Sequence, residues 1–146
     1  MQATRLRVLL PALWAGVLLC IALIATPAPF AVLTQAEAGR VVSRIFAQEA
    51  YLSLGLAVLL FLLERRSARF AAAAGKGSVF STELVLLLGT LFCTVAGYFA
   101  IQPMMAAARS GQGGVSFAVL HGVSTGFFAL KALLVCALAW RAAKPA

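Results

Sequence analysis

The stretch "FAVLHGVSTGFFALKALL", residues 117–134, shows most clearly what kind of fold this chain adopts. It belongs to an apolar run that can cross a bilayer, since about 20 residues of helix span about 30 Å of hydrocarbon. It also carries the chain's single histidine, His121, and a lysine, Lys131. A charge near the bilayer centre costs at least about 2.5–3.5 kcal/mol on insertion scales. We therefore expect Lys131 to meet a polar group inside the protein.

The rest of the chain has the same apolar character. Of its 146 residues, 63% are hydrophobic and 11% are charged, whereas about a quarter of the residues are charged in a typical soluble domain. The sequence predicts an all-α fold, an integral membrane four-helix bundle that forms one domain over residues 1–146. The four predicted spans cover about residues 8–33, 47–63, 81–101 and 116–140.

Prolines and polar stretches set the expected limits of these spans. Pro27 and Pro29 interrupt the far end of the first span, and Pro103 is expected to end the third. The basic segment 64–78 is expected to be a loop. Before the second span, Arg40, Arg44 and Gln48 recur at spacing four, which we interpret as an interfacial extension of that helix.

The positive charge follows the positive-inside pattern of membrane proteins. Twelve Lys and Arg oppose four Glu, and the basic residues lie mainly at helix ends and in short loops, so we expect no nucleic-acid partner. With both termini cytoplasmic, the inner segments hold eight basic residues and the outer segments three, which favours this orientation. The inner set is Arg5, Arg7, Arg65, Arg66, Arg69, Lys76, Arg141 and Lys144, and the outer set is Arg40, Arg44 and Arg109.

Polar groups share one face of the last span. At about 100° per residue, His121, Ser124, Phe128 and Lys131 fall within an arc of about 80°. Lys131 in this polar stripe is either a proton or anion site, or it is a satisfied polar contact or a snorkelling lysine. Lys131 lies ten residues from Arg141, which places it near the bilayer centre at about 1.5 Å per residue.

The third span offers partners for Lys131 at a similar depth. Thr90 and Thr94 are the first candidates, while Glu64 and Glu83 can reach Lys131 only if its side chain points towards the inner boundary. Alternatively, desolvation leaves the amine neutral.

Small residues mark the faces expected to pack against neighbouring helices. Gly122 and Gly126 form a GxxxG pair on the last span, and Gly89 and Gly97 lie on one face of the third. Small residues let helix backbones approach closely, and van der Waals packing drives association in lipid.

His121 has two interpretations. It is either a hydrogen-bonded histidine near the outer interface or part of a soft-metal site with Met104 and Met105, because thioether and imidazole ligands suit Cu(I). Enzyme signatures are lacking: Ser124 lies one turn from His121, but no third group is available to orient a triad. We expect neither catalytic residues nor a cofactor.

Several short motifs resemble the transmembrane-protein-205-like family, four-helix membrane proteins whose bacterial members are often catalogued as a domain of unknown function. The motifs are P-x-x-F at Pro27 to Phe30, "AGRVVSRIF", "QPMMAAAR" with Pro103 and Arg109, and L-H-x-x-S in "FAVLHGVS". The resemblance implies four spans and places weight on these residues, but it implies no reaction. Members often carry Asn one turn after the serine, where this chain has Phe128.

Two functions remain open. The first is a bacterial inner-membrane protein with an interaction role, as a homo-oligomer or as an accessory subunit of a membrane complex. The second is a permease or resistance protein for a solute or a soft metal ion, which uses the polar stripe of the last helix. The lipid bilayer is an expected partner in both cases, and the permease is expected to act as a dimer or larger assembly because four spans are few for a transporter.

Overall fold

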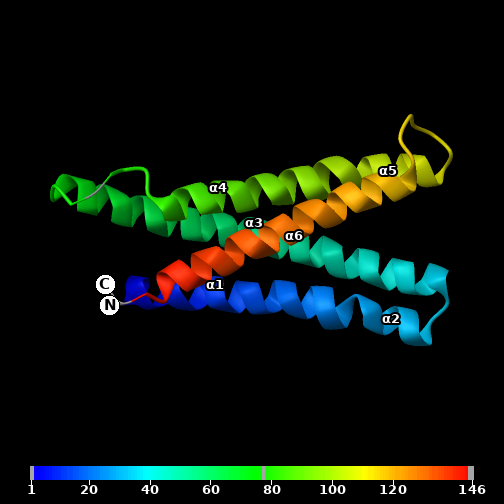
Figure 1. Ribbon diagram of the computed structural model, residues 1–146, viewed down its shortest axis with the longest axis horizontal. Helices are drawn as coiled ribbons and strands as arrows, with labels where there is room; N and C mark the ends of the chain where they lie inside the picture. Colours follow the sequence, from blue (N-terminus) through cyan, green and yellow to red (C-terminus); the bar gives the residue numbers. More distant parts are fainter. Residues whose placement is uncertain (1, 77, 145–146) are drawn as a thin grey trace.

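The structure is a computed structural model that describes residues 2–76 and 78–144 (Figure 1). Its described part contains helices and turns and no strand, which confirms the all-α prediction. In the part of the chain that the structure describes, four segments are long and apolar enough to cross a membrane: Arg5–Val32, Gln35–Ala73, Thr82–Arg109 and Phe117–Ala142. Residues 1 and 145–146 of the predicted domain lie outside the described residues.

Two of the four spans contain a π-helical segment close to a proline. In the first span, α1 (Gln2–Cys20) passes through the π-helix η1 (Ile21–Ala25) to α2 (Pro27–Val32). A proline lacks a backbone N–H and its ring clashes with the preceding turn. The wider π turn absorbs this mismatch and keeps the chain helical.

The third span repeats this arrangement, and the expectation that Pro103 ends it is wrong. Here α4 (Thr82–Thr94) passes through η2 (Val95–Ala100) to α5 (Ile101–Arg109), and Pro103 lies inside α5. In hydrocarbon, each unsatisfied backbone group costs several kcal/mol. The chain therefore continues as a helix through the proline.

Helix α3 (Gln35–Ala73) is the longest element, with 39 residues. It begins with a capping box, in which Thr34 and Glu37 satisfy each other's backbone N–H groups. At about 1.5 Å per residue the helix is about 58 Å long, well beyond the thickness of the hydrocarbon core. The loop expected at residues 64–78 is helical up to Ala73, because its Ala, Arg and Glu residues are strong helix formers.

Helix α6 (Phe117–Ala142) crosses the bundle diagonally (Figure 1). It lies beside α5 near its start and beside α1 near its end, and it also packs along α4. The start of α1, the end of α6 and the turn between α3 and α4 all lie at one end of the bundle, which we call the terminal end. The α2–α3 and α5–α6 turns lie at the other end, which we call the distal end.

Close packing is concentrated in the half of the bundle towards the terminal end. Its core joins α1, α3, α4 and α6 through apolar side chains that are almost fully buried. A smaller buried cluster of Ile101, Met105 and Leu120 joins α5 to α6 in the distal half. The larger core is formed by Trp14, Ala15, Leu18, Ala57, Leu60, Leu87, Val135 and Leu138.

Two glycines of the third span allow α6 to approach closely. A Cβ atom added at Gly97 would lie 2.5 Å from the Cβ of Phe127, and one added at Gly89 would lie 3.0 Å from a Leu134 methyl group. Gly122 and Gly126, by contrast, are exposed, and an added Cβ would meet nothing within 4 Å. The small-residue face of the third span is therefore used inside the chain, whereas that of α6 is open.

Gly97→Ala is expected to lower the free energy of unfolding by about 1–3 kcal/mol, because overpacking forces the two helices apart. Gly122→Ala is the matched control, since its added methyl group meets open space. Reversible unfolding of both variants in mixed micelles measures the difference. Equal stabilities of the two variants would contradict the close contact between η2 and α6.

Candidate functional site

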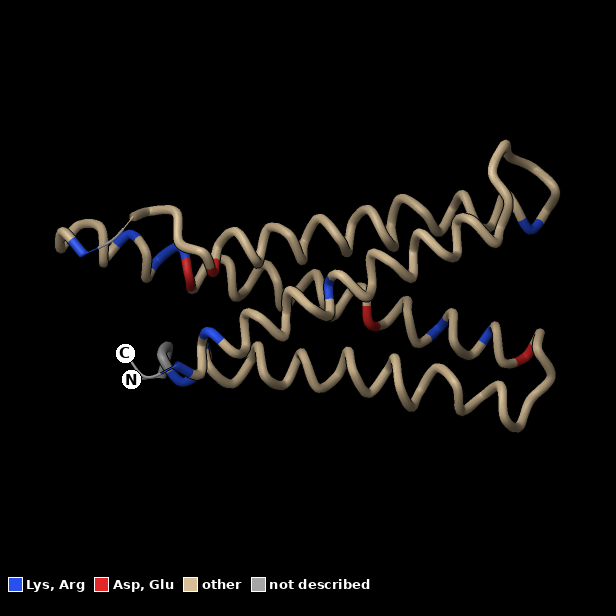
Figure 2. Tube along the Cα trace, in the orientation of Figure 1, with Lys and Arg blue, Asp and Glu red and all other residues tan. Residues whose placement is uncertain are grey.

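Three ion pairs connect the helices within the described residues. Arg7 of α1 holds Glu64 of α3 through two hydrogen bonds of 2.6 Å, and Arg141 of α6 holds Glu83 of α4 at 2.8 Å. The third pair joins Lys131 of α6 to Glu49 of α3. Figure 2 shows that charged residues gather at the two ends of the bundle, apart from an acidic and a basic position near its middle.

The pair in the middle of the bundle is buried. The Nζ atom of Lys131 lies 2.7 Å from Oε1 of Glu49, and the two side chains are 4% and 3% exposed. The same Nζ lies 5.1 Å from the centroid of the Phe128 ring, within the range of a cation–π contact. Lys131 thus meets a polar partner inside the protein, as the energetic cost of its depth requires.

The prediction that Thr90 or Thr94 is the polar partner of Lys131 is wrong, because the partner is Glu49. Thr90 and Thr94 are buried nearby, but their hydroxyl groups donate to the carbonyl oxygens of Leu87 and Thr90 in their own helix. Their hydroxyl oxygens could still accept from an ammonium group, but the Nζ atom of Lys131 donates to the carboxylate of Glu49 instead.

The predicted second span begins near residue 47, which places the Glu49 carboxylate at the interface and away from the depth of Lys131. Since α3 begins at Gln35, Glu49 lies 14 residues, or about 21 Å, into the helix. A signal was available in the sequence: Glu49 directly precedes the apolar run 50–63 and shares a helix face with Ser53, four residues on.

Glu49 also anchors a hydrogen-bond chain across three helices. Its Oε1 accepts from the hydroxyl group of Ser53, which in turn accepts from the indole N–H of Trp14 at 2.9 Å. Trp14 and Ser53 are both almost fully buried. The chain thus fixes α1 and α3 around the carboxylate that Lys131 of α6 approaches.

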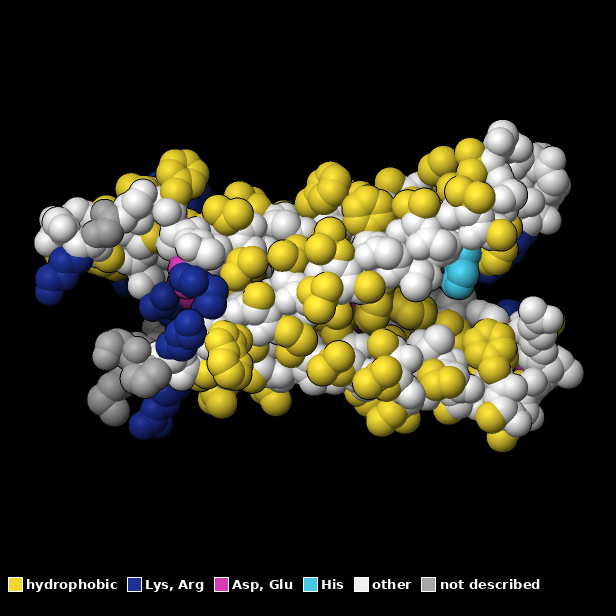
Figure 3. Space-filling view, viewed as in Figure 1, with side chains coloured by type: hydrophobic (Ala, Val, Ile, Leu, Met, Phe, Trp, Pro, Cys, Tyr) yellow, Lys and Arg dark blue, Asp and Glu magenta, His cyan; other side chains and the backbone are white. Residues whose placement is uncertain are grey.

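A cavity of about 820 Å³ lies on the distal side of this ion pair. Figure 3 shows a hollow between α6 and the α1–α2 segment, beside the histidine. Helices α2, α3, α4, α5 and α6 contribute to its walls, together with η2. Its lining includes polar Gln35, Arg40, Ser43, Glu49, Thr94, Gln102, Arg109, His121, Ser124, Thr125 and Lys131, and apolar Phe30, Phe46, Met105, Phe117 and Phe128.

Aromatic contacts hold the basic side chains at the rim of the cavity. The guanidinium carbon of Arg109 lies 4.6 Å from the centroid of the Phe117 ring, and His121 stacks on the same ring at 5.7 Å. Arg109 and His121 are both exposed, so they meet solvent or ligand at the rim. Deeper in the cavity, Phe46 and Phe128 pack edge to face at 5.2 Å.

The side chain of Ser124 links α6 to the third span. Its hydroxyl group donates to the carbonyl oxygen of Gly97 at 2.7 Å, within the π-helix η2. A π turn disturbs the regular backbone hydrogen bonding, and this side chain supplies an additional partner for it. The polar stripe of α6 therefore divides into a rim residue, His121, a packing residue, Ser124, and the buried Lys131.

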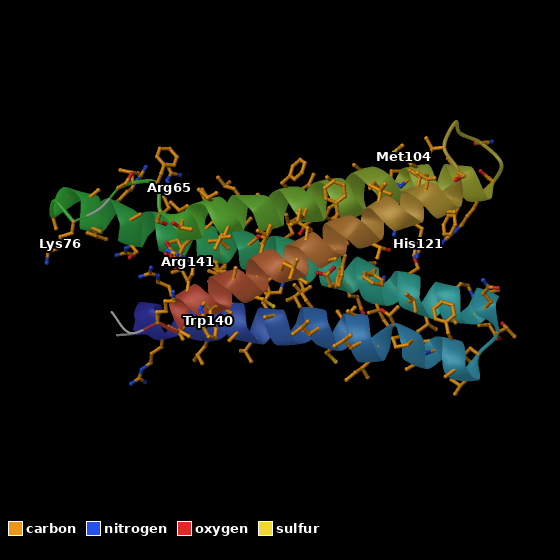
Figure 4. All side chains as sticks on the ribbon, viewed as in Figure 1. Arg65, Lys76, Met104, His121, Trp140 and Arg141 are labelled. Atoms are coloured by element: carbon orange, nitrogen blue, oxygen red, sulfur yellow. The ribbon has the colours of Figure 1, made fainter. Side chains whose placement is uncertain are left out.

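The structure separates the two methionines of the predicted soft-metal site. Met105 and His121 both line the cavity, whereas Met104 is 47% exposed and lies outside the lining (Figure 4). Among the residues that the structure describes, no three His, Cys, Asp or Glu side chains lie close enough together to hold a metal ion.

The residues singled out by the family resemblance lie either on the cavity wall or next to the π-helical segments. Phe30 and Arg109 line the cavity, on α2 and α5. Pro27 begins α2 directly beyond η1, and Pro103 lies in the first turn of α5 beyond η2. The prolines therefore lie where the two spans bend around the cavity, and the other two residues lie on its surface.

One family model matches residues 9–113, and its description is "Domain of unknown function (DUF4149)". The matched region includes Arg40, Glu49 and Arg109 of the cavity and ends before α6, which supplies Lys131 and His121. The chain matches no curated protein and no solved structure.

Lys131→Met is expected to lower the free energy of unfolding by about 3–5 kcal/mol, because it leaves the Glu49 carboxylate buried without its charged partner. The double variant Lys131→Met/Glu49→Gln should recover most of this loss. Unfolding of the purified protein in mixed micelles measures both.

Lys144→Met serves as the control, since it removes the same charge from an exposed position at the terminal end. If Lys131→Met were as stable as Lys144→Met, the buried ion pair would not exist in the folded protein.

Proposed function

The chain belongs to the family of unknown function DUF4149, and we propose that it is a small permease-type protein that binds a solute in the distal cavity. The cavity carries this proposal. Ligand sites typically have volumes of about 300–1,000 Å³ and a mostly apolar lining with a few placed polar groups. A cavity of about 820 Å³ with aromatic walls and basic residues at its rim has this character.

The proposed setting is the bacterial inner membrane, with both termini cytoplasmic. Support comes from the basic residues, eight of which lie in the segments at the terminal end and three in those at the distal end. In this orientation the cavity opens towards the outer face of the membrane. The resemblance to the transmembrane-protein-205-like family fits this setting, and we propose common ancestry with it.

The ion pair of Glu49 and Lys131 forms the floor of the cavity, and the tightly packed core continues beyond it. The arrangement corresponds to one state of an alternating-access cycle, open on one side and closed on the other. In this proposal, passage of the solute requires α6 to move away from α1 and α3. A chain of four spans is small for a transporter, so a homo-oligomer is expected to be the working form.

The proposal contains no catalytic step and no cofactor. The hydroxyl group of Ser124 is engaged by the Gly97 carbonyl oxygen, which removes it as a nucleophile for His121. A soft metal ion is less well supported as the solute, because only Met105 and His121 of its predicted ligands line the cavity.

Thiol labelling tests the proposal in phosphatidylcholine vesicles. Single-cysteine variants are made from a background in which Cys20, Cys93 and Cys136 are replaced by Ala. Gln102→Cys, in the cavity lining, should react with a membrane-impermeant maleimide from the distal side only. Cys136, retained alone, lies beyond Lys131 in α6 and should react from the terminal side while the protein turns over.

Lys131→Met should increase the labelling of Cys136, because it removes the floor contact. An unreactive Gln102→Cys would exclude a water-accessible cavity. A reactive Gln102→Cys together with a Cys136 that never reacts would indicate a binding protein without transport.

A second candidate function is assembly, either of copies of this chain or with a larger membrane complex as an accessory subunit. It is favoured by Gly122 and Gly126, which lie on an exposed face of α6 that no described helix of the chain covers. A GxxxG pair of this kind suits close packing against a second helix.

Gly122→Leu should shift the protein to a smaller assembly without lowering its stability, because no atom of residues 2–76 or 78–144 lies within 4 Å of the added Cβ. Gly16→Leu on α1 is the matched control, since that position is equally open. Light scattering of the detergent-solubilised protein measures the assembly size. An unchanged size for Gly122→Leu would exclude this face as the interface.

A further inference from the structure

We propose that the ligand of the distal cavity is an anionic phospholipid whose phosphate group lies between Arg40 and Arg109 and whose chains leave towards the bilayer. This inference rests on the proposed function, since it names the ligand of the same cavity. It follows from the charge of the lining, the position of its aromatic residues and the direction in which the cavity opens.

The lining carries uncompensated positive charge. Lys131 and Glu49 neutralise each other, and Glu49 is the one carboxylate among the described residues of the lining. Arg40 and Arg109 also line the cavity, and within the described residues neither takes part in an ion pair. Guanidinium groups bind phosphate oxygens through paired hydrogen bonds, which makes these two arginines suited to a phosphate group.

The wall between the rim and the floor is aromatic. Phe117 of α6 packs against Arg109 and Phe30 of α2 lines the cavity, while Phe46 and Phe128 form the edge-to-face pair near the ion pair. A small hydrophilic anion gains nothing from such a wall. Apolar area removed from water stabilises a complex by about 25 cal/mol per Å², so a ligand with an apolar part fits this lining better.

The cavity also opens sideways. In Figure 3 the hollow faces the viewer between α6 and the α1–α2 segment, with apolar side chains on both edges. Phe30 on the α2 edge is 48% exposed, and α2 belongs to the first candidate span. Because the opening lies within candidate spans, it faces acyl chains as well as the aqueous rim. A molecule already dissolved in the bilayer can therefore enter without leaving it.

The basic rim, the aromatic wall and the side opening indicate where the phosphate group and the acyl chains of a phospholipid would lie. The phosphate group meets Arg40 and Arg109 at the rim, where His121 supplies a further hydrogen-bond donor or acceptor. The start of the acyl chains follows the aromatic wall, and the chains continue through the side opening into the bilayer. Anionic headgroups are attracted to such basic sites, at about 1 kcal/mol for each basic residue near a membrane surface.

Protection of a cavity cysteine tests this inference on the full-length protein. Gln102→Cys, in the background without native cysteines, is reconstituted into phosphatidylcholine vesicles with and without about one quarter phosphatidylglycerol. Val115→Cys, in the α5–α6 turn at the same end and outside the lining, corrects for the effect of surface charge on the maleimide. Phosphatidylglycerol should slow the corrected labelling of Gln102→Cys about tenfold.

Charge removal then locates the headgroup. Arg40→Gln/Arg109→Gln should abolish the protection, whereas Arg66→Gln/Arg69→Gln, which removes the same charge from the terminal end, should leave it unchanged. Excess inorganic phosphate added to pure phosphatidylcholine vesicles should give no protection, and equal protection by free phosphate would overturn the lipid as the ligand.

The outcomes separate this inference from the proposed function. Rapid labelling of Gln102→Cys that phosphatidylglycerol does not change would overturn the phospholipid and leave a water-accessible cavity for another solute. If Gln102→Cys were not labelled in pure phosphatidylcholine vesicles, the cavity would not be accessible to water, and both proposals would be overturned.

Discussion

The interaction on which the structure depends is the buried ion pair between Glu49 and Lys131. Each charge alone is costly at this depth. The pair offsets that cost because the Nζ atom of Lys131 lies only 2.7 Å from Oε1 of Glu49, and because the hydroxyl group of Ser53 donates a further hydrogen bond to the carboxylate. The pair joins α3 to α6, and the bond from Trp14 to Ser53 extends it to α1. The position of α6 in the bundle is thus fixed at one polar point within an apolar environment.

This fixed point separates two halves with different character. Towards the terminal end, apolar side chains fill the space between four helices. Towards the distal end, α6 runs diagonally to join α5, and the first and third spans change course at their π-helical segments. The cavity occupies the space that this divergence leaves between α6 and α2. The prolines, the π turns and the basic rim are therefore parts of one arrangement around the cavity.

The sequence predicts the all-α fold and the four apolar spans well, because bilayer thickness imposes a length on every crossing. It also predicts that Lys131 needs a polar partner, but not which one. That choice depends on where α3 begins, and the capping box of Thr34 and Glu37 lies well before the apolar run. The glycines of the third and last spans are equally hard to assign from sequence. Their spacing alone does not reveal that Gly97 faces α6 while Gly122 faces outwards. The cavity depends on the relative tilt of several helices, which no local pattern encodes.

The central claim is that Glu49 and Lys131 form an ionic contact inside the membrane-embedded bundle. Infrared difference spectroscopy of the protein with ¹³C-labelled glutamate, recorded against Glu49→Gln, observes this carboxyl group directly. The account predicts that the band lost in the variant is that of an ionised carboxylate, and that it changes in Lys131→Met. A band of a protonated carboxyl group that is indifferent to Lys131→Met would contradict the account.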